Sequence, residues 1–523
     1  MVERFRAAVL ALVLAMPAPA VAQERPKGPR PSPAQAAVAE GVALLQQNRV
    51  GEARERFARA LALDPASPDA HYMLGWVHEQ ERDLDGAARE YEAALVAAPG
   101  RAEVHDRLAF VRGEQGRTED AIAGFRRAVA IDPRLFDARY HLGATLWWTG
   151  DAAGALPQLR EAVKLRPTHA ESRYYLGLSL KKTGNLPGAV GQLRRAVRLN
   201  PTLLPAYVQL GAALREWGDI EGAVAMSRKA VELDSTSVDA RNVLGLALME
   251  KGEAEAAVAA FRDALAAGPT SASARHNLGS ALLQKGDLEG AVAVYRELTA
   301  AEPRSAEAFY NLGVALKQKD DFAGAEEALR QAVALDETAM LPEARFTLGV
   351  VQWQTARPED AVASFRGALA AKPEYGEAHY MLGTVLRQQG RIDDARAEFR
   401  ETVRLQPRSA EAYLSLGQLL RQQGDAAGGS AALAEAERLN KAKADAQAAT
   451  FAVSAGRKKL AVRDLAGAIA SFREAVRLSP GDAQAQYQLG LALQKAGQAV
   501  EARRHLAEAR RLAPYLAASD ARD

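Results

Sequence analysis

The chain has 523 residues, of which 48% are hydrophobic and 25% charged. This balance excludes wholesale disorder, because enough apolar surface is available to bury a large core. The 67 Lys and Arg nearly match the 65 Asp and Glu, and the two signs are interleaved, so the chain lacks the basic stripe that nucleic-acid binding requires. Cysteine is absent, which excludes disulfides, thiol catalysis, Cys-ligated zinc and a lipid-anchored cysteine.

Residues 1–22 have the pattern of a secretory signal peptide. Arg4 and a second arginine precede an apolar run at residues 7–16, and residues 20–22 supply the small-x-small cleavage pattern. The apolar run is about ten residues long, whereas a helix needs roughly 20 to cross a bilayer. We therefore expect cleavage after Ala22 rather than a retained anchor, and a periplasmic or secreted mature protein. No later segment is apolar enough to span a membrane.

The mature chain is predicted to begin with a linker. Residues 23–33 are polar and rich in proline, a composition typical of an extended spacer. The repeating part of the chain starts at residue 34.

A strict 34-residue period organises the rest of the chain. A Gly or Ala that follows a Leu, here termed the marker residue, recurs at Gly75, Ala109, Gly143, Gly177, Gly211, Gly245, Gly279 and Gly313. Twelve residues after each marker stands an Ala, and four residues further on stand Tyr91, Phe125, Leu159, Leu193, Ser227, Phe261, Tyr295 and Leu329. A proline usually closes the unit. Each unit predicts two amphipathic helices joined by a short turn.

This pattern of Leu-Gly, Ala, aromatic, Ala and Pro resembles the tetratricopeptide repeat. The resemblance extends from a first unit with marker Gly41 to a last unit with marker Gly490. A single helical hairpin cannot bury its apolar stripe alone, so the units are expected to stack. The fold class implied is all-α, an α-α superhelix formed by a right-handed solenoid of about fourteen hairpins.

The register slips twice along the array. Gly313 to Gly349 is two residues longer than the period, and Gly417 to Gly456 is five residues longer. We therefore predict twelve repeats at residues 34–443, a junction at 444–448, two repeats at 449–516 and a tail at 517–523. Residues 440–450 are either a loosened junction, such as a hinge, or a lengthened helix.

Small residues at fixed positions predict how each unit folds. The glycines that follow the first helix in many units are expected to be C-caps: Gly150, Gly184, Gly218, Gly252, Gly286, Gly390 and Gly424. The marker residue and the Ala twelve residues on are small so that the two helices can approach closely, and the aromatic is expected to fill the gap to the neighbouring unit.

No catalytic motif stands out in the sequence. His-Glu-x-x-His, Gly-x-Ser-x-Gly and phosphate-binding Gly-rich patterns are missing. His71, His105 and His379 recur at one position of the first helix, where stacked imidazoles suggest metal binding, but adjacent units lie roughly 10 Å apart, too far for two ligands of one ion. A packing role is favoured. We expect no enzyme activity, no cofactor and no metal.

Tyr, Arg or Lys, and Gln recur at three first-helix positions, namely three residues before and four and five residues after the marker. In proteins that this chain resembles, these positions face a concave groove that holds peptides. Their chemistry fits that role, although helix surfaces need polar residues anyway. The candidate partner-binding residues, where this set is densest, are Tyr310, Lys317, Gln318, Phe346, Gln354, Tyr380, Arg387, Gln388, Arg421 and Gln422. Asn277 and Asn311 resemble two rungs of the asparagine ladder found in some arrays of the family.

The sequence thus predicts a non-catalytic scaffold that binds a peptide or protein partner, in assembly of a cell-envelope complex. The alternative is a polysaccharide-associated export or assembly subunit. An enzyme with a cryptic site is the third class. Nucleic acid is not an expected partner, and the oligomeric state is left open.

The export prediction rests on residues 1–22. N-terminal sequencing of the protein from its native host should begin at Gln23. A mature protein that retains Met1 in the cytosol would contradict it.

Overall fold

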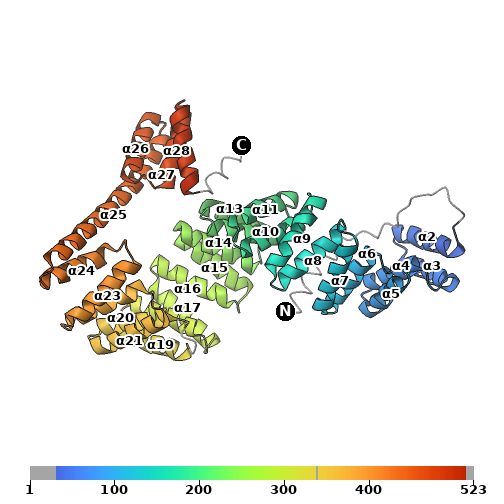
Figure 1. Cartoon of the computed structure of the whole chain (residues 1–523), viewed down its shortest axis with the longest axis horizontal. Helices are drawn as coiled ribbons and strands as arrows, with labels where there is room; N and C mark the ends of the chain where they lie inside the picture. Colours follow the sequence, from blue (N-terminus) through green and yellow to red (C-terminus); the bar gives the residue numbers. More distant parts are fainter. Residues whose placement is uncertain (1–30, 337–339, 514–523) are drawn as a thin grey trace. The chain divides into compact units, whose positions relative to one another are not determined.

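The computed structural model describes residues 31–336 and 340–513. The described residues form 27 helices and no strand, which confirms the all-α, tetratricopeptide-type solenoid fold class (Figure 1). The signal peptide predicted at 1–22, most of the predicted linker and the predicted tail at 517–523 lie outside the described residues.

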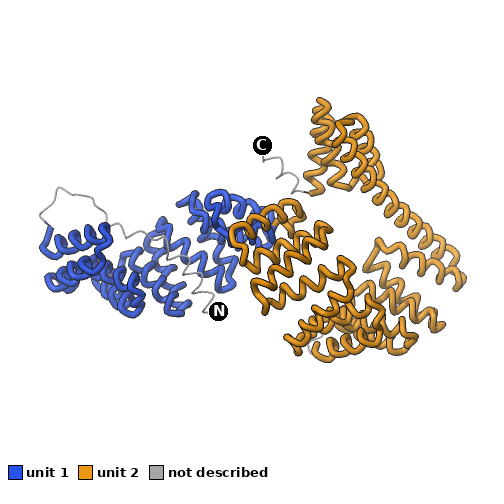
Figure 2. Tube along the Cα trace, turned by 180° about the vertical axis from the view of Figure 1, so that it is seen from behind, with its two compact units in different colours: residues 1–213 blue, residues 214–523 orange. Residues whose placement is uncertain are grey.

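The chain divides into two compact units, one up to Ala213 and one from Leu214 (Figure 2). The first unit holds α2 (Pro33–Gln46), α3 (Val50–Leu63), α4 (Pro68–Gln80), α5 (Leu84–Ala97), α6 (Ala102–Glu114), α7 (Thr118–Ile131), α8 (Phe136–Trp148), α9 (Ala152–Leu165), α10 (Ala170–Lys182), α11 (Leu186–Leu199) and most of α12 (Leu204–Glu216). From α2 to α11, each helix contacts the next one in sequence.

The second unit holds α13 (Ile220–Leu233), α14 (Val238–Lys251), α15 (Ala254–Ala267), α16 (Ala272–Lys285), α17 (Leu288–Ala301), α18 (Ala306–Gln318), α19 (Phe322–Leu335), α20 (Pro342–Gln354), α21 (Pro358–Ala371), α22 (Gly376–Gln388), α23 (Ile392–Leu405), α24 (Ala410–Gln422), α25 (Ala426–Ala461), α26 (Leu465–Leu478), α27 (Ala483–Lys495) and α28 (Ala499–Leu512). Pairing the 27 described helices in chain order gives fourteen hairpins only if α25 serves twice, as the second helix of hairpin 12 and the first helix of hairpin 13.

The core passes from hairpin to hairpin within each unit. In the first unit one buried apolar cluster extends from Ala37 to Val111, and the next from Ala109 to Ala189. Each hairpin therefore buries its apolar side chains against its neighbours, as stacking requires.

The marker glycine is the point of closest approach within a hairpin. A Cβ placed on Gly245 would lie 2.5 Å from the ring of Phe261, sixteen residues later. The same contact joins Gly75 to Tyr91, at 2.6 Å. The aromatic thus lies over the marker of its own hairpin, and does not only fill the gap to the neighbouring unit as the sequence suggested. A side chain at the marker would displace a fully buried ring.

The one Ala marker among the helical units is accommodated by a compensating glycine. Ala109 occupies the marker position of the third hairpin, and its Cβ lies 2.6 Å from where a Cβ on Gly124 would stand. The corresponding position in other hairpins carries a side chain, such as Glu90 or Gln158. In this hairpin the first helix carries the methyl group and the second helix carries the glycine, so the two helices can keep the same spacing.

Left-handed residues end the first helices, as predicted. Each glycine expected as a C-cap has a positive φ, from +76° at Gly390 to +93° at Gly150. In five hairpins a residue with a side chain takes this conformation: Asn48, Arg82, Asp320, Ala356 and Arg463. The conformation is therefore set by the hairpin, and glycine makes it less strained.

Two alternative devices begin the second helices. In one, an Asp or Asn accepts a hydrogen bond from a glycine three residues later, as from Gly154 N–H to Asp151 Oδ1 at 2.8 Å, and a Cβ on that glycine would lie 2.2 Å from the carboxylate. In the other, an arginine pairs with an acid three residues later, as Arg117 with Asp120 at 2.6 Å. Each satisfies the charge preference of a helix N-terminus.

Helix α25 differs from the other helices of the array. It runs for 36 residues without interruption, so residues 444–448, predicted as a junction, lie inside a helix. Of the two alternatives for residues 440–450, the structure has the lengthened helix. Lys441 stands where most units carry their closing proline, so no proline ring removes the backbone N–H or blocks the next turn. Ser235 also replaces this proline, yet α13 ends at Leu233, so the missing proline permits the longer helix without requiring it.

Replacing Gly245 by Ala should destabilise its hairpin by roughly 1–3 kcal/mol, because the added methyl group overlaps Phe261. The matched control is Gly191→Ala, a helical glycine with nothing within 4 Å of an added Cβ, which should stabilise by roughly 0.5–1 kcal/mol. Hydrogen exchange should speed up in α14 and α15 of the Gly245 variant only. Uniform loss of protection along the chain would contradict packing between neighbours alone.

Candidate functional site

The recurring histidine position of the first helices has a structural role. Nε2 of His71 lies 3.0 Å from the carbonyl oxygen of Pro65, and its Nδ1 lies 2.7 Å from Glu90. Arginine does the same in other hairpins, where Arg139 donates to the carbonyl of Pro133 at 3.0 Å. These side chains satisfy the carbonyl left free beside the proline that closes the preceding unit. In the part of the chain that the structure describes, no group of three or more acidic or histidine side chains is arranged to hold a metal.

The ten candidate partner-binding residues lie on four first helices of the second unit. Tyr310, Lys317 and Gln318 belong to α18, Phe346 and Gln354 to α20, Tyr380, Arg387 and Gln388 to α22, and Arg421 and Gln422 to α24. They occupy the side along which consecutive first helices meet. Trp353 on α20 donates from Nε1 to Gln388 on α22 at 2.9 Å, and Gln284 on α16 donates to the carbonyl of Met249 on α14 at 2.9 Å.

The aromatic members of this set are partly used in packing. Phe346 packs against Phe365 and Tyr375, with ring centroids 5.7 and 5.0 Å apart. Tyr380 packs against Phe399 at 5.8 Å, and the guanidinium of Arg387 lies 5.8 Å from the same ring.

Burial raises the pKa of the Tyr310 phenol, although its hydrogen bond with Thr347 lowers it. Tyr310 is half-buried, as are the other aromatic members. These residues can therefore give a partner only the exposed part of their rings.

The polar members of the set are more open to solvent. Gln318, Gln354, Arg421 and Gln422 are exposed and have no hydrogen-bond or ion-pair partner among residues 31–336 and 340–513. They leave amide and guanidinium groups available over α18, α20 and α24. Such groups can bind the backbone or carboxylates of another chain.

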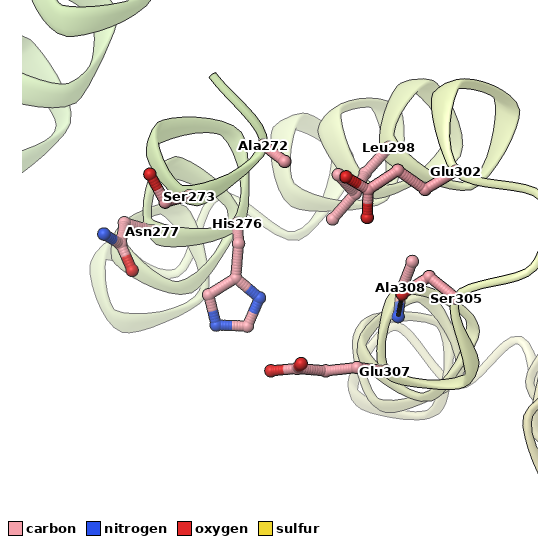
Figure 3. A pocket seen from close by; sticks show the side chains of 9 residues that line it. All are labelled: Ala272, Ser273, His276, Asn277, Leu298, Glu302, Ser305, Glu307 and Ala308. Carbon is pink, nitrogen blue, oxygen red and sulfur yellow. Dashed lines mark hydrogen bonds between the residues drawn. The ribbon is translucent and has the colours of Figure 1, made fainter. Parts of the chain in front are cut away.

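A pocket of about 260 Å³ lies beside this set, between α16, the end of α17 and the start of α18 (Figure 3). His276 and Glu307 point into the same space, and Glu302 approaches from α17. Nδ1 of His276 lies 3.0 Å from Nδ2 of Asn311, which links α16 to α18. Of the two asparagines noted in the sequence, Asn277 lines the pocket, and Asn311 contacts the lining residue His276.

The pocket is acidic and its carboxylates are unpaired. Glu302 and Glu307 have no ion-pair partner in the described part of the chain. Acids at the position of Glu307 are paired in some other hairpins, as Asp137 with Arg166 at 3.3 Å and Glu343 with Lys372 at 3.3 Å, whereas Asp239 and Glu377 have no ion pair among the described residues. The pocket can therefore accept a cationic group. The sequence gave no signal for it, because an acid at this position recurs in most units and fits the helix dipole.

The first unit carries a buried polar pair, His141 and Asp106, on the first helices of two adjacent hairpins. Nδ1 of His141 on α8 lies 2.9 Å from Asp106 on α6, and the two residues are 3% and 4% exposed. Burial alone would lower the pKa of His141, but the attraction and hydrogen bond of Asp106 outweigh it, so the pKa lies above its ordinary value. The rings of Phe110 and Phe125 flank the imidazole. The pair joins two hairpins and is closed to solvent.

Among the described residues, no helix combines the length and apolarity needed to cross a bilayer. This finding covers residues 31–336 and 340–513 alone.

Comparison with known proteins adds a family match. A family model described as tetratricopeptide repeat matches residues 38–102, 145–203, 208–272, 314–376, 346–405, 380–449 and 453–517. A second, described as TPR repeat, matches residues 111–150 and 279–320. The matched residues exceed half of the chain. No curated protein is found as a relative.

Three solved structures illustrate the similarity. Yeast Tom70 is 15% identical, with 75% of this chain and 96% of that chain covered and a TM-score of 0.42. YrrB, described as a TPR protein with an unusual peptide-binding site, is 24% identical, with 36% and 98% covered and a TM-score of 0.34. PilF of Pseudomonas aeruginosa is 20% identical, with 40% and 95% covered and a TM-score of 0.37.

The geometry around His141 predicts a titration. Its pKa should lie above the ordinary histidine value, and Asp106→Asn should lower it, because burial then acts without the opposing carboxylate. The pair's contribution to stability should be present below the ordinary pKa and lost as pH rises through the raised one. NMR of isotope-labelled histidine checks both statements. An unchanged pKa in Asp106→Asn would show that the pair does not form.

Proposed function

Because the chain belongs to the tetratricopeptide repeat family, whose members are protein–protein interaction scaffolds, we propose that it is a non-catalytic scaffold. A peptide or protein partner binds along the first helices of the second unit, from α16 to α24. The observation that carries the proposal is the set of exposed amide and guanidinium groups on α18, α20 and α24, which have no partner among the described residues.

The contact chemistry favours a polypeptide. Gln318, Gln354 and Gln422 offer both donors and acceptors, which match the alternating N–H and C=O groups of an extended backbone. The half-buried rings of Tyr310 and Tyr380 offer apolar contact with little loss of side-chain entropy. These positions form the concave groove in proteins that the chain resembles.

The acidic pocket adds a preference within that partner. Glu302 and Glu307 are free of cations in the described chain, and His276 and Asn277 provide further polar groups beside them. A Lys or Arg side chain of the partner supplies the missing charge. The stem of that side chain packs on Leu298, which also lines the pocket.

The proposed place of action is the bacterial cell envelope. Residues 1–22 support export, since they have the order of charges, apolar run and small residues that signal peptidases recognise. The protein is then a periplasmic or secreted scaffold for assembly of an envelope complex. The alternative is a polysaccharide-associated export or assembly subunit. It predicts that a glycan, and not a protein, is recovered with the chain.

Photo-cross-linking in the native host tests the surface. A photoreactive residue at Gln388, on α22, should cross-link to the partner, whereas one at Arg366, on α21, should not, because both are exposed but only the first lies on the proposed surface. Recovery of a glycan in place of a protein would support the polysaccharide alternative. Equal cross-linking from both sites would contradict binding along the first helices.

Removing two first-helix cations should weaken binding of the captured partner. Arg387→Ala with Arg421→Ala is expected to cost about 2 kcal/mol, or about thirty-fold in Kd, since guanidinium anchors carry much of an interface's energy. The matched control, Arg366→Ala with Arg400→Ala, removes the same charge from exposed second-helix positions and should cost less than about 0.5 kcal/mol.

The pocket is tested in the same titration. Glu302→Gln with Glu307→Gln should also weaken binding, and adding salt should reduce the difference from wild type. Full affinity in both double variants, with unchanged melting temperatures, would place the binding surface elsewhere.

A further inference from the structure

The middle of α25 carries an exposed stripe that has no counterpart elsewhere in the described array. The residues of this stripe, here termed the α25 stripe, are Glu437, Lys441, Ala444, Ala448, Phe451, Ala455, Lys458 and Val462, and each is exposed. They follow one another at alternating spacings of four and three residues. Such spacing keeps the side chains on one side of a helix and is the spacing of helices that pair.

Phe451 occupies a position that is buried in the other hairpins. Twelve residues stand at the same place, five before the marker, and each is between 0% and 1% exposed: Ala70, Val104, Ala138, Ser172, Ala206, Ala240, Ala274, Ala308, Ala344, Ala378, Ala412 and Ala485. The first helices that carry eleven of them contact the second helix of the preceding hairpin, as α22 contacts α21. Phe451 is larger than any of them and is 76% exposed. This position is normally an interface between hairpins, and here it is uncovered.

The preceding hairpin is uncovered at the same junction. Leu414, on α24, is 42% exposed. Glu437, on the first half of α25, takes the place that Val403 and Val476 hold in the neighbouring second helices. The cause is the continuity of α25 (Figure 1). Because the second helix of hairpin 12 and the first helix of hairpin 13 are one straight helix, they cannot fold back on each other.

Antiparallel pairing of two α25 helices covers Phe451 with a second chain. With the twofold axis between residues 447 and 448, Glu437 of one copy lies opposite Lys458 of the other, and Ala444 lies opposite Phe451. Each ring then meets a small residue, and each carboxylate meets an ammonium group. The two Ala448 residues flank the axis and contact each other. Every other contact occurs twice, as twofold symmetry requires.

We propose that the α25 stripe binds a second copy of this chain, in an antiparallel twofold dimer. The second half of α25 of one copy packs on the first half of α25 of the other, and the two helices run antiparallel. The occupant is chosen by the charge complementarity of Glu437 and Lys458 and by the shape fit of Phe451 on Ala444.

Site-specific disulfide formation tests the pairing. Because the chain has no cysteine, a disulfide can form only at the introduced residues. The full chain, purified from its native host, should sediment as a dimer. Ala448→Cys should form a disulfide-linked dimer on oxidation. Ala455→Cys should not, because the stripe residue nearest to residue 455 of one copy is residue 441 of the other. Lys441→Cys mixed with Ala455→Cys should give the mixed dimer. Cross-linking of Ala455→Cys to itself would indicate parallel or random contact and would overturn the proposal.

Two further variants separate pairing from folding. Phe451→Asp should raise the dimer dissociation constant by about ten-fold or more without affecting folding, because the side chain is 76% exposed. Val500→Asp changes a residue that is 77% exposed on α28 and should leave the dimer intact. Glu437→Lys or Lys458→Glu alone should weaken the dimer about five-fold, and the two together should restore it. A chain that stays monomeric in sedimentation at every concentration would refute the proposal, whether or not a partner binds along α16 to α24.

Discussion

The contact between the marker residue and the ring or branched side chain sixteen residues later sets the spacing of each hairpin, and the rest of the array depends on it. In most hairpins a glycine on the first helix lets a fully buried Phe, Tyr or Leu lie directly on the backbone, as Phe261 lies on Gly245. Where the marker is Ala109, the facing residue of the second helix is Gly124, so the larger residue on one helix is matched by a smaller one on the other. The distance between the two helices is therefore what the hairpins share. With that distance fixed, each hairpin offers its neighbours the same surfaces, so hairpins can stack at a constant period.

A second constraint acts between hairpins, where the chain must reverse direction. The closing proline ends the second helix, and a His or Arg in the next hairpin satisfies the carbonyl beside it, as His379 does for Pro373 at 3.0 Å. At Lys441 the proline is missing, and the helix continues into the next hairpin. The missing proline permits this continuation but does not cause it alone, because Ser235 stands at the same position in an earlier hairpin and α13 still ends at Leu233. The continuous helix removes a junction, leaves Phe451 uncovered, and is the only stretch of the described array in which one helix serves two hairpins.

The sequence predicted the features that depend on one residue type at one position. Glycines such as Gly150 were expected to end first helices, and they have the left-handed φ that favours glycine. The sequence left open whether residues 440–450 are a loop or a helix, because a missing proline removes a stop signal but does not require continuation. It also did not reveal the acidic pocket. Glu307 fits the charge preference of a helix start, and only the structure shows that it lacks the cation that pairs with Asp137 or Glu343.

Some positions of each repeat are used for packing within the array, and only the remaining positions are available for a partner to recognise. The marker residue, the ring, the closing proline and the carbonyl-binding side chain all make contacts within the array. In the proposed binding mode, specificity therefore resides in first-helix positions such as those of Lys317 and Arg387. On the proposed surface the charges are not mixed evenly. The pocket at α16 to α18 is acidic, whereas Lys317, Arg387 and Arg421 follow on α18, α22 and α24. A partner segment with a basic residue at one end and acidic residues toward the other matches both regions in one direction only, since reversing it brings like charges together. The surface thus favours one orientation of the bound chain.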